Sequence, residues 1–572
     1  MTPENKFAQA KYISGRPVAE FPSSPSCFRL ARQWLDNCLE NHEDSCPYSR
    51  ESILPSRVID VGSFDGSLRP RILNTRNQRG SWIALSHCWG KKAQAVTTSQ
   101  NLSLRQENIP WEELSQTNLD AIFVTRRLGY RHLWIDLLCI LQDNSTDWEL
   151  ESAQMGRYYK NSVFTIAVDA ADGDDVGFLQ LQREQRPMQI SMPCHSPSIM
   201  TEEIIYLRET IRVPDFRGDT CLSKRAWALQ EDLSSPRTLH YTAKQMVWEC
   251  QYMTLCESDT NNQRNNSLDL DLVPKRYFLA PDANNGYFDG SDQYNDPLYR
   301  WMNIVANFLT RSLTFEDDKF PAISGVAREI HEQTDFIYRA GIWVEDIRRG
   351  LLWNTNGAGR VPAKFRAPSW SWAALDLDPD EVKKVRDNGI YNTILFSHPE
   401  ITSSAVNVLD HQIVPKDIDP YGRLVSGYLV LRGLWLPLAE WRGHHRVYLR
   451  SDKPSRYKSH FFAWWDSETS LEEREIWPEH PEQLICNFDC YSPEFDIEIT
   501  GATFRGISLL QISAWDWVGN GKEGCNESIF SCALMLAKTN VDDIFKRVET
   551  AEVPWINALE KTSWSERDVK II

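Results

Sequence analysis

Carboxylate, imidazole, thiol and indole side chains gather in three stretches of the first half of the chain. These stretches are SWIALSHCWG (81–90), LWIDLLCILQDNSTDWELESAQMGRYYKNS (133–162) and RAWALQEDLSSPR (225–237). The first two place polar residues at the end of an apolar run, and the third places them on a short predicted helix. Site residues of open α/β sheets lie where strands end, so these stretches supply the candidate site.

Glu151 is the most unusual carboxylate in these stretches. In a helix predicted over 147–160, it falls with Trp148 on the apolar face. Glu149 falls off that face and would complete a capping box with Thr146. Burying an unpaired carboxylate is very costly, so Glu151 must be paired with a cation, neutralised, or directed into a cleft. A structural ion pair and a catalytic carboxylate are both open at this point.

The other two stretches offer binding residues and no nucleophile–base pair. His87 and Cys88 are adjacent, and in a continuing strand their side chains would point to opposite faces. His87 is therefore expected to orient or pack. The third stretch gathers polar and aromatic residues on one short helix: Arg225, Trp227, Gln230 and Glu231. A salt-bridged amphipathic helix and a substrate-facing helix explain them equally well.

A separate group of metal-ligating residue types lies near the start of the chain. Cys38, His42 and Cys46 are four apart, which in a helix within 27–46 would place them on one face and would permit a metal ion. A fourth ligand at convincing spacing is missing, since Cys27 is the only candidate. We therefore expect a small helical lid packed by its Cys and Leu side chains and assign no metal site, leaving metal binding by the three residues open.

The elements that carry the three stretches predict an α/β fold. They are a strand at 82–88, a helix at 118–130, a strand at 133–141, a helix at 147–160 and a strand at 162–168. A βαβαβ series of this kind indicates a parallel sheet with right-handed crossovers. No GxGxxG or Walker-type loop follows any of these strands, so dinucleotide binding of the Rossmann type and P-loop chemistry are not supported.

Pattern and composition divide the chain into five segments. We predict a leader and helical lid (1–54), the α/β domain (55–257), a polar linker or long loop (258–298), a helical and aromatic middle region (299–399) and a mainly β C-terminal domain with sandwich or barrel-like packing (400–572).

The overall composition excludes several classes of protein. A content of 42% hydrophobic and 25% charged residues is that of a globular chain. The net charge of −17 argues against nucleic acid or anionic lipid as a partner of the whole protein. No apolar run is long enough to span a bilayer, and the start lacks a signal-peptide core. Thirteen Cys without a framework spacing fit a reducing compartment, so we expect a cytoplasmic protein.

Together the three stretches resemble the fungal heterokaryon-incompatibility (HET) domain family, which would make 55–257 a HET domain. The downstream RSLTFEDDKFPAISGVA, AGIWVEDIRRGLLW and RAPSWSW are similar to the region that follows this domain in many such proteins. The resemblance implies a cytoplasmic fungal protein whose activation drives non-self recognition and cell death. HET domains are regarded as distant relatives of TIR domains, so it also implies a flavodoxin-like parallel sheet.

Some TIR domains hydrolyse NAD+ with a Glu on the helix after a central strand, and Glu151 matches that position in kind. The resemblance then implies NAD+ or a related nucleotide as substrate, no required cofactor, and a homo-oligomer or partner protein on activation. Under this hypothesis the substrate-binding residues are His87, Cys88, Trp89, Asp136, Trp148, Arg225, Trp227, Gln230 and Glu231. The alternative is a non-enzymatic signalling module that oligomerises and recruits partners, in which Glu151 pairs with a core cation.

Overall fold

A computed structural model of the chain describes residues 16, 18–43, 45–46, 52–90, 95–183, 190–196, 199–207, 220–258, 263–264, 296–354, 359–377, 395–396, 406–437, 448–449, 485–488, 507–517, 528–541, 543–555 and 565–572. The chain forms two compact units. Unit 1 comprises Met1–Asp296 and Arg311–Glu329, and unit 2 comprises Pro297–Thr310 and Ile330–Ile572. Most of the predicted linker at 258–298 lies outside the described residues.

Unit 1 is built around a nine-stranded sheet with the order β13-β12-β11-β10-β7-β5-β6-β2-β3. Its strands are β2 (Arg57–Asp60), β3 (Arg71–Asn74), β5 (Ile83–Ser86), β6 (His132–Trp134), β7 (Thr165–Val168), β10 (Arg237–Tyr241), β11 (Met246–Cys250), β12 (Met253–Cys256) and β13 (Gln263–Arg264). The central strands β6, β5, β7 and β10 run parallel to one another. The strands outside them pair antiparallel. The predicted parallel sheet is therefore the centre of a mixed sheet.

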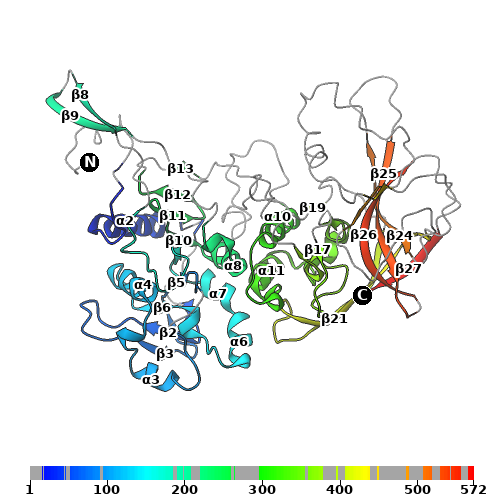
Figure 1. Cartoon of the computed structure of the whole chain (residues 1–572), viewed down its shortest axis with the longest axis horizontal. Coiled ribbons are helices and arrows are strands. Elements are labelled where there is room, and N and C mark those ends of the chain that lie inside the picture. Colours follow the sequence, from blue (N-terminus) through cyan, green and yellow to red (C-terminus); the bar gives the residue numbers. More distant parts are fainter. Residues whose placement is uncertain are drawn as a thin grey trace. The chain divides into compact units, whose positions relative to one another are not determined.

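The parallel strands have a reversal in their order. Numbered by sequence, β6, β5, β7 and β10 read 2-1-3-4 across the sheet. Helix α4 (Gln116–Arg127), between β5 and β6, lies on one side of the sheet in Figure 1, while α7 (Met155–Lys160) and α8 (Ala226–Ser234) lie on the other. The order reverses between β5 and β7, and ligands of open α/β sheets bind beyond the strand ends at such a point.

The stretch after β6 differs from the predicted strand at 133–141. The strand ends at Trp134, and the four-residue helix α5 (Asp136–Cys139) follows. In its first turn, the Leu137 N–H donates to Oδ1 of Asp136 at 2.8 Å. Leu133 and Trp134 of β6 and all four residues of α5 are buried, and periodicity does not separate a buried strand from a buried helical turn. Asp136 therefore lies just after the end of β6 and not in the middle of the strand predicted at 133–141.

The predicted helix at 147–160 is two helices, α6 (Ser145–Ser152) and α7. The predicted capping box is wrong, because Asn144 caps α6 by accepting a hydrogen bond from the Asp147 N–H at 3.1 Å. Asn is a strong N-cap residue, and an earlier start leaves Thr146 inside the first turn. The break after Ser152 redirects α7 toward α8, which it contacts closely.

The N-terminal helix α2 (Pro25–Asn41) packs on the same core as the sheet. Ser24 caps it, since its side chain accepts from the Cys27 N–H, and Pro25 occupies the first turn, where no N–H is needed. Its buried face includes Leu30, Trp34 and Cys38. The helix ends at Asn41, so His42 and Cys46 lie beyond it instead of on the predicted helical face.

The remaining elements of unit 1 are short and connect these parts. They are β1 (Ser52–Ile53), β4 (Arg79–Gly80), α3 (Leu102–Glu107), η1 (Trp111–Glu113), β8 (Ile190–Ser196), β9 (Ile199–Leu207), η3 (Leu222–Lys224) and η5 (Glu316–Asp318). Helix α11 (Pro321–Thr334) begins in unit 1 and ends in unit 2.

Unit 2 combines a small helical and aromatic part with a large β-sheet. The first part contains α10 (Pro297–Leu309), β14 (Tyr338–Arg339), β15 (Ile342–Trp343), η6 (Val344–Asp346), α12 (Ile347–Leu351), β16 (Trp353–Asn354), β17 (Gly359–Arg360), η7 (Trp372–Ala374), β18 (Asp376–Leu377) and β19 (Leu395–Phe396). Its core holds several fully or almost fully buried indoles, among them Trp343, Trp353, Trp370 and Trp372. These account for part of the high tryptophan content.

The eight-stranded sheet of unit 2 closes on itself through five strands. Its members are β20 (Asn407–Pro415), β21 (Leu424–Pro437), β22 (Tyr448–Leu449), β23 (Ile485–Phe488), β24 (Ile507–Trp517), β25 (Ser528–Lys538), β26 (Ile544–Trp555) and β27 (Ser565–Ile571). Because β27 pairs with both β21 and β26, the strands β21-β24-β25-β26-β27 form a ring. Leu431, Leu510, Leu534 and Val569 are fully buried there, as alternation predicts for a closed barrel. The alternating segment HFFAWWD (460–466), which by its pattern is also expected to be a strand, lies outside the described residues.

None of the helices in the described part of the chain is long and apolar enough to cross a lipid bilayer.

Candidate functional site

The polar residues after β5 form a buried network with α8. The Ser86 hydroxyl, at the last position of β5, donates to Oε2 of Glu231. The Arg225 guanidinium, at the N-cap of α8, donates to the His87 carbonyl oxygen. His87 Nε2 lies 3.4 Å from Oδ1 of Asp174. The strand end of β5 and the first turns of α8, almost 140 residues apart in sequence, therefore build one site.

The end of β6 adds a third carboxylate to this network. The Trp89 indole N–H donates to Oδ2 of Asp136 at 3.0 Å, and the Arg225 guanidinium lies 5.8 Å from the Trp89 ring centroid. Asp136 and Glu231 are 7% and 2% exposed, whereas Trp89 and Arg225 are half-buried. Two buried carboxylates, Asp136 and Glu231, therefore lie with an indole and a guanidinium that are both partly exposed.

The charges of this site act on one another. The pKa of Glu231 is raised, mainly by burial and further by Asp136. Arg225 and the Ser86 hydroxyl act in the opposite direction and lower it. Burial also raises the pKa of Tyr159 well above its usual value, with Glu231 and Asp136 as further causes, and its hydroxyl donates to the Leu85 carbonyl at 3.0 Å. A carboxylate held in this way stabilises positive charge that develops next to it.

Three other predicted residues contribute packing around this network. Cys88 is buried against Ala167 and Ala228, and burial raises the pKa of its thiol to about 11, so it is not an activated nucleophile. Gln230 accepts the Gly325 N–H at 2.6 Å, which ties α8 to α11. Trp227 is half-buried.

Trp148 and Trp227 meet edge to face, with ring centroids 6.4 Å apart. Both are half-buried, and they join α6 to α8. This pair places a second half-buried aromatic surface on α6 and α8.

Glu151 is held elsewhere in the same unit. It is 4% exposed, its Oε1 lies 3.7 Å from Nη2 of Arg57, and its Oε2 accepts from the Tyr158 hydroxyl at 3.0 Å. Its pKa is raised, because burial is the largest cause. The hydrogen bond to Ser56, the charge of Arg57 and the hydrogen bond to Tyr158 act in the opposite direction. Arg57 also binds Asp147 at 2.5 Å. These contacts of Glu151 with Arg57 and Tyr158 are those of a structural ion pair.

Sequence reasoning did not single out Ser86, Tyr159 or Asp174. Ser86 ends an apolar run, where alternation gives it no distinct role, and Tyr159 lies on the apolar face of the helix predicted at 147–160. Asp174 lies in an Asp-rich loop that offered no reason to prefer one carboxylate over its neighbours. Their roles follow from pairs that are distant in the sequence.

A second buried ionic group lies beside the network, on β10. His240 Nδ1 lies 2.8 Å from Oδ2 of Asp169, and Nε2 lies 3.6 Å from Oε2 of Glu249. Burial alone would lower the pKa of His240, but these two carboxylates and Asp232 raise it to about 9. His240 is therefore a buried imidazolium at pH 7.

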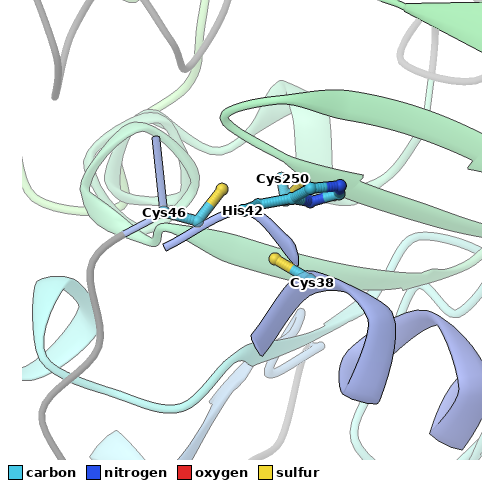
Figure 2. A group of neighbouring side chains, drawn as sticks. All are labelled: Cys38, His42, Cys46 and Cys250. Atoms are coloured by element: carbon cyan, nitrogen blue, oxygen red, sulfur yellow. Dashed lines mark hydrogen bonds between the residues drawn. The ribbon is translucent and has the colours of Figure 1, made fainter. Parts of the chain in front are cut away.

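Four metal-ligating side chains meet between α2 and β11. They are Cys38, His42, Cys46 and Cys250, and one ligand atom from each lies within 4.8 Å of those of the others. Figure 2 shows Cys38 on the helix, His42 and Cys46 on the segment after it, and Cys250 on a strand of the sheet. Cys27 lies elsewhere, with its Sγ 3.6 Å from Oε1 of Glu257.

One segment of unit 1 matches a known protein family. Residues 82–231 match the family model described as "Heterokaryon incompatibility protein (HET)". The chain contains a HET domain. The match runs from the residue before β5 into α8 and includes every predicted catalytic and substrate-binding residue. It confirms the resemblance seen in the sequence and supports a role related to heterokaryon incompatibility. No curated protein and no solved structure matches the chain significantly.

Proposed function

We propose that the HET domain hydrolyses NAD+ at the nicotinamide–ribose bond and that this reaction drives cell death in fungal non-self recognition. The observation that carries the proposal is the joining of Trp89 and Arg225 to the buried carboxylates Asp136 and Glu231 at the ends of parallel strands. The 2-1-3-4 strand order supports a relation to the flavodoxin-like TIR group, and the site lies beside the reversal of that order.

The chemistry needs one fixed negative charge and one water molecule. The C1′–N bond breaks with its electron pair going to nicotinamide, which leaves as a neutral base. Positive charge builds on the ribose, and a carboxylate stabilises it as in glycoside hydrolysis. Water then attacks C1′ and releases a proton to solvent, so the products are nicotinamide, ADP-ribose and one proton. No general acid is required.

The partly exposed residues of the site suit the rest of such a substrate. The half-buried indole of Trp89 offers a face on which nicotinamide stacks. Arg225 supplies a guanidinium for the diphosphate, and Asp136 accepts a hydrogen bond from a ribose hydroxyl. In this arrangement Glu231 is the carboxylate closest to the reacting bond.

Two carboxylates compete for the catalytic role. Resemblance to TIR domains favours Glu151, which follows Trp148 on the helix after β6. Geometry favours Glu231, because its hydrogen bond to Ser86 and its proximity to Arg225 belong to the site, whereas Arg57 and Tyr158 hold Glu151. We assign the charge-stabilising role to Glu231 and keep Glu151 as the alternative.

Entry of a nucleotide requires this site to open. Asp136 and Glu231 are almost fully buried, so a ligand has to displace Trp89 or Arg225 from its present contacts. We propose that self-association or a partner protein produces the open form, which keeps the resting protein harmless in the cytoplasm.

The test measures NAD+ loss and nicotinamide release by the full chain, purified and also expressed in cells where it is toxic. Glu231→Gln and Glu151→Gln are compared with Glu149→Gln, a control on the same helix as Glu151. Loss of cleavage in Glu231→Gln alone supports the assignment, and loss in Glu151→Gln alone transfers the catalytic role to Glu151.

Each comparison also includes thermal unfolding, so that loss of folding is distinguished from loss of chemistry. Intact NAD+ in cells that the wild-type chain kills overturns the enzymatic proposal. That result favours the non-enzymatic signalling module, for which the closed site and the paired Glu151 are the supporting observations.

A further inference from the structure

We propose that Cys38, His42, Cys46 and Cys250 bind one structural Zn²⁺ ion that fastens helix α2 to the sheet of the HET domain. Three thiols and one imidazole are a ligand set that tetrahedral zinc uses in structural sites. The proposal is independent of NAD+ hydrolysis, since none of the four residues belongs to the network around Glu231.

The distances fit a single ion. Around zinc, two sulfurs bound at ~2.3 Å lie about 3.8 Å apart, and a sulfur and an imidazole nitrogen lie about 3.6 Å apart. Cys250 Sγ lies 3.6 Å from Nδ1 of His42. All four ligand atoms lie within 4.8 Å of one another, so no pair has to close by more than about 1 Å, which small side-chain rotations provide.

The backbone after α2 fixes the order of three ligands. The His42 N–H donates to the Cys38 carbonyl at 3.1 Å, and the Cys46 N–H donates to the His42 carbonyl at 2.7 Å. These bonds continue the turn past the helix end and bring the three side chains to one side. The His42 ring also packs on Tyr252, with ring centroids 4.3 Å apart, which fixes the ring with Nδ1 toward Cys250.

The charges nearest the ligands fit a zinc–thiolate centre. Zn²⁺ with three thiolates and a neutral imidazole carries a net charge of −1. The Arg237 guanidinium is fully buried and donates to the Cys38 sulfur at 3.2 Å and to the Cys46 carbonyl. A buried negative centre requires a compensating cation, and hydrogen bonds to ligating groups orient them. Arg237, at the start of β10, provides both.

The fourth ligand gives the ion a structural role. Cys250 is the last residue of β11, more than 200 residues after His42. A zinc ion bound to all four residues therefore joins α2 and the segment after it to β11. Structural zinc contributes its binding free energy to folding, so removal of the ion should loosen α2 and β11 first.

The experiment measures zinc in the full chain after expression in zinc-supplemented medium. We expect about one zinc per chain, released by a strong chelator, with a drop in melting temperature. Replacement by Co²⁺ should give the visible bands of tetrahedral cobalt together with sulfur-to-cobalt charge transfer. A folded wild-type protein that holds no zinc and gives no such spectrum overturns the proposal.

The variants Cys250→Ala and Cys38→Ala test the ligands from the two elements. Cys139→Ala is the matched control, because Cys139 is a fully buried free thiol of α5 outside the cluster. Zinc content should fall at least tenfold in the first two variants and stay at the wild-type value in the control. Equal loss in all three variants overturns the proposal, because zinc loss would then follow instability instead of ligand removal.

Thiol labelling of the wild type keeps the test decisive even if the variants do not fold. Cys38, Cys46 and Cys250 should become alkylated when the chelator is added, while Cys139 stays protected. A disulfide between any two of the three cysteines, found by mass spectrometry of the freshly purified protein, also overturns the proposal.

Discussion

The buried His240 imidazolium should make unit 1 less stable as pH rises above neutrality. Its pKa is about 9 in the folded chain, against 6.5 for the free side chain. A group whose folded pKa is raised contributes stability that is complete below its unfolded pKa and is lost as pH rises through its folded pKa. The window for His240 therefore runs from about pH 6.5 to 9.

The two pKa values set the magnitude. The full difference corresponds to about 3 kcal/mol, and integrating the linkage relation gives a loss of about 2 kcal/mol between pH 7 and 9. Asp169 after β7, Glu249 on β11 and Asp232 on α8 are the groups that hold the proton. Deprotonation leaves these carboxylates facing a neutral ring in a buried place.

Hydrogen exchange of peptides that cover β10 and β11 measures this effect in unit 1 alone, because unfolding of a two-unit chain is not a single transition. After correction for the intrinsic pH dependence of exchange, the opening free energy of β10 should fall by about 2 kcal/mol from pH 7 to 9. In His240→Gln this decline should be absent. An equal decline in the variant, or unchanged protection in the wild type, would refute the assignment of a charged His240.

Three further substitutions test the packing. Arg57→Met should cost about 3–5 kcal/mol of stability, because it leaves the buried Glu151 and the half-buried Asp147 without their cation; thermal unfolding checks this, and addition of Glu151→Gln should restore part of the loss. Gly90→Ala should destabilise the turn after Trp89 by about 1–2 kcal/mol or more, since its φ is +73° and a Cβ would lie 2.9 Å from the Gly173 Cα; an unchanged melting temperature would contradict this account. In the barrel of unit 2, Leu431→Ala should cost about 2–5 kcal/mol because Leu431 is fully buried. The exposed Val425→Ala on the same strand should change the stability by less than about 0.5 kcal/mol, as urea unfolding can measure.

Much of the HET domain could be predicted from local patterns. The amphipathic α4 and the parallel arrangement of β5, β6 and β7 follow from hydrophobic periodicity and from the polar strand ends. The fully buried α5 was missed, because buried helical turns and buried strands have the same apolar composition. The break between α6 and α7 was missed as well. Asn144, and not Thr146, is the N-cap of α6, because Asn144 has the extended backbone of an N-cap residue and Thr146 lies inside the first turn.

By itself, the sequence determined which residues are able to do chemistry and which strand ends would carry them. It identified Asp136, Arg225 and Glu231 as polar residues on α/β elements, and three metal-ligating residues near α2. Only the tertiary structure decided the pairs: Glu231 with Ser86, Glu151 with Arg57, and Cys250 with His42. The reason is physical. Residue spacing fixes neighbours within one helix or strand, whereas contacts such as Ser86–Glu231, across 145 residues, and His42–Cys250, across 208, are set by how sheets and helices bury their apolar faces.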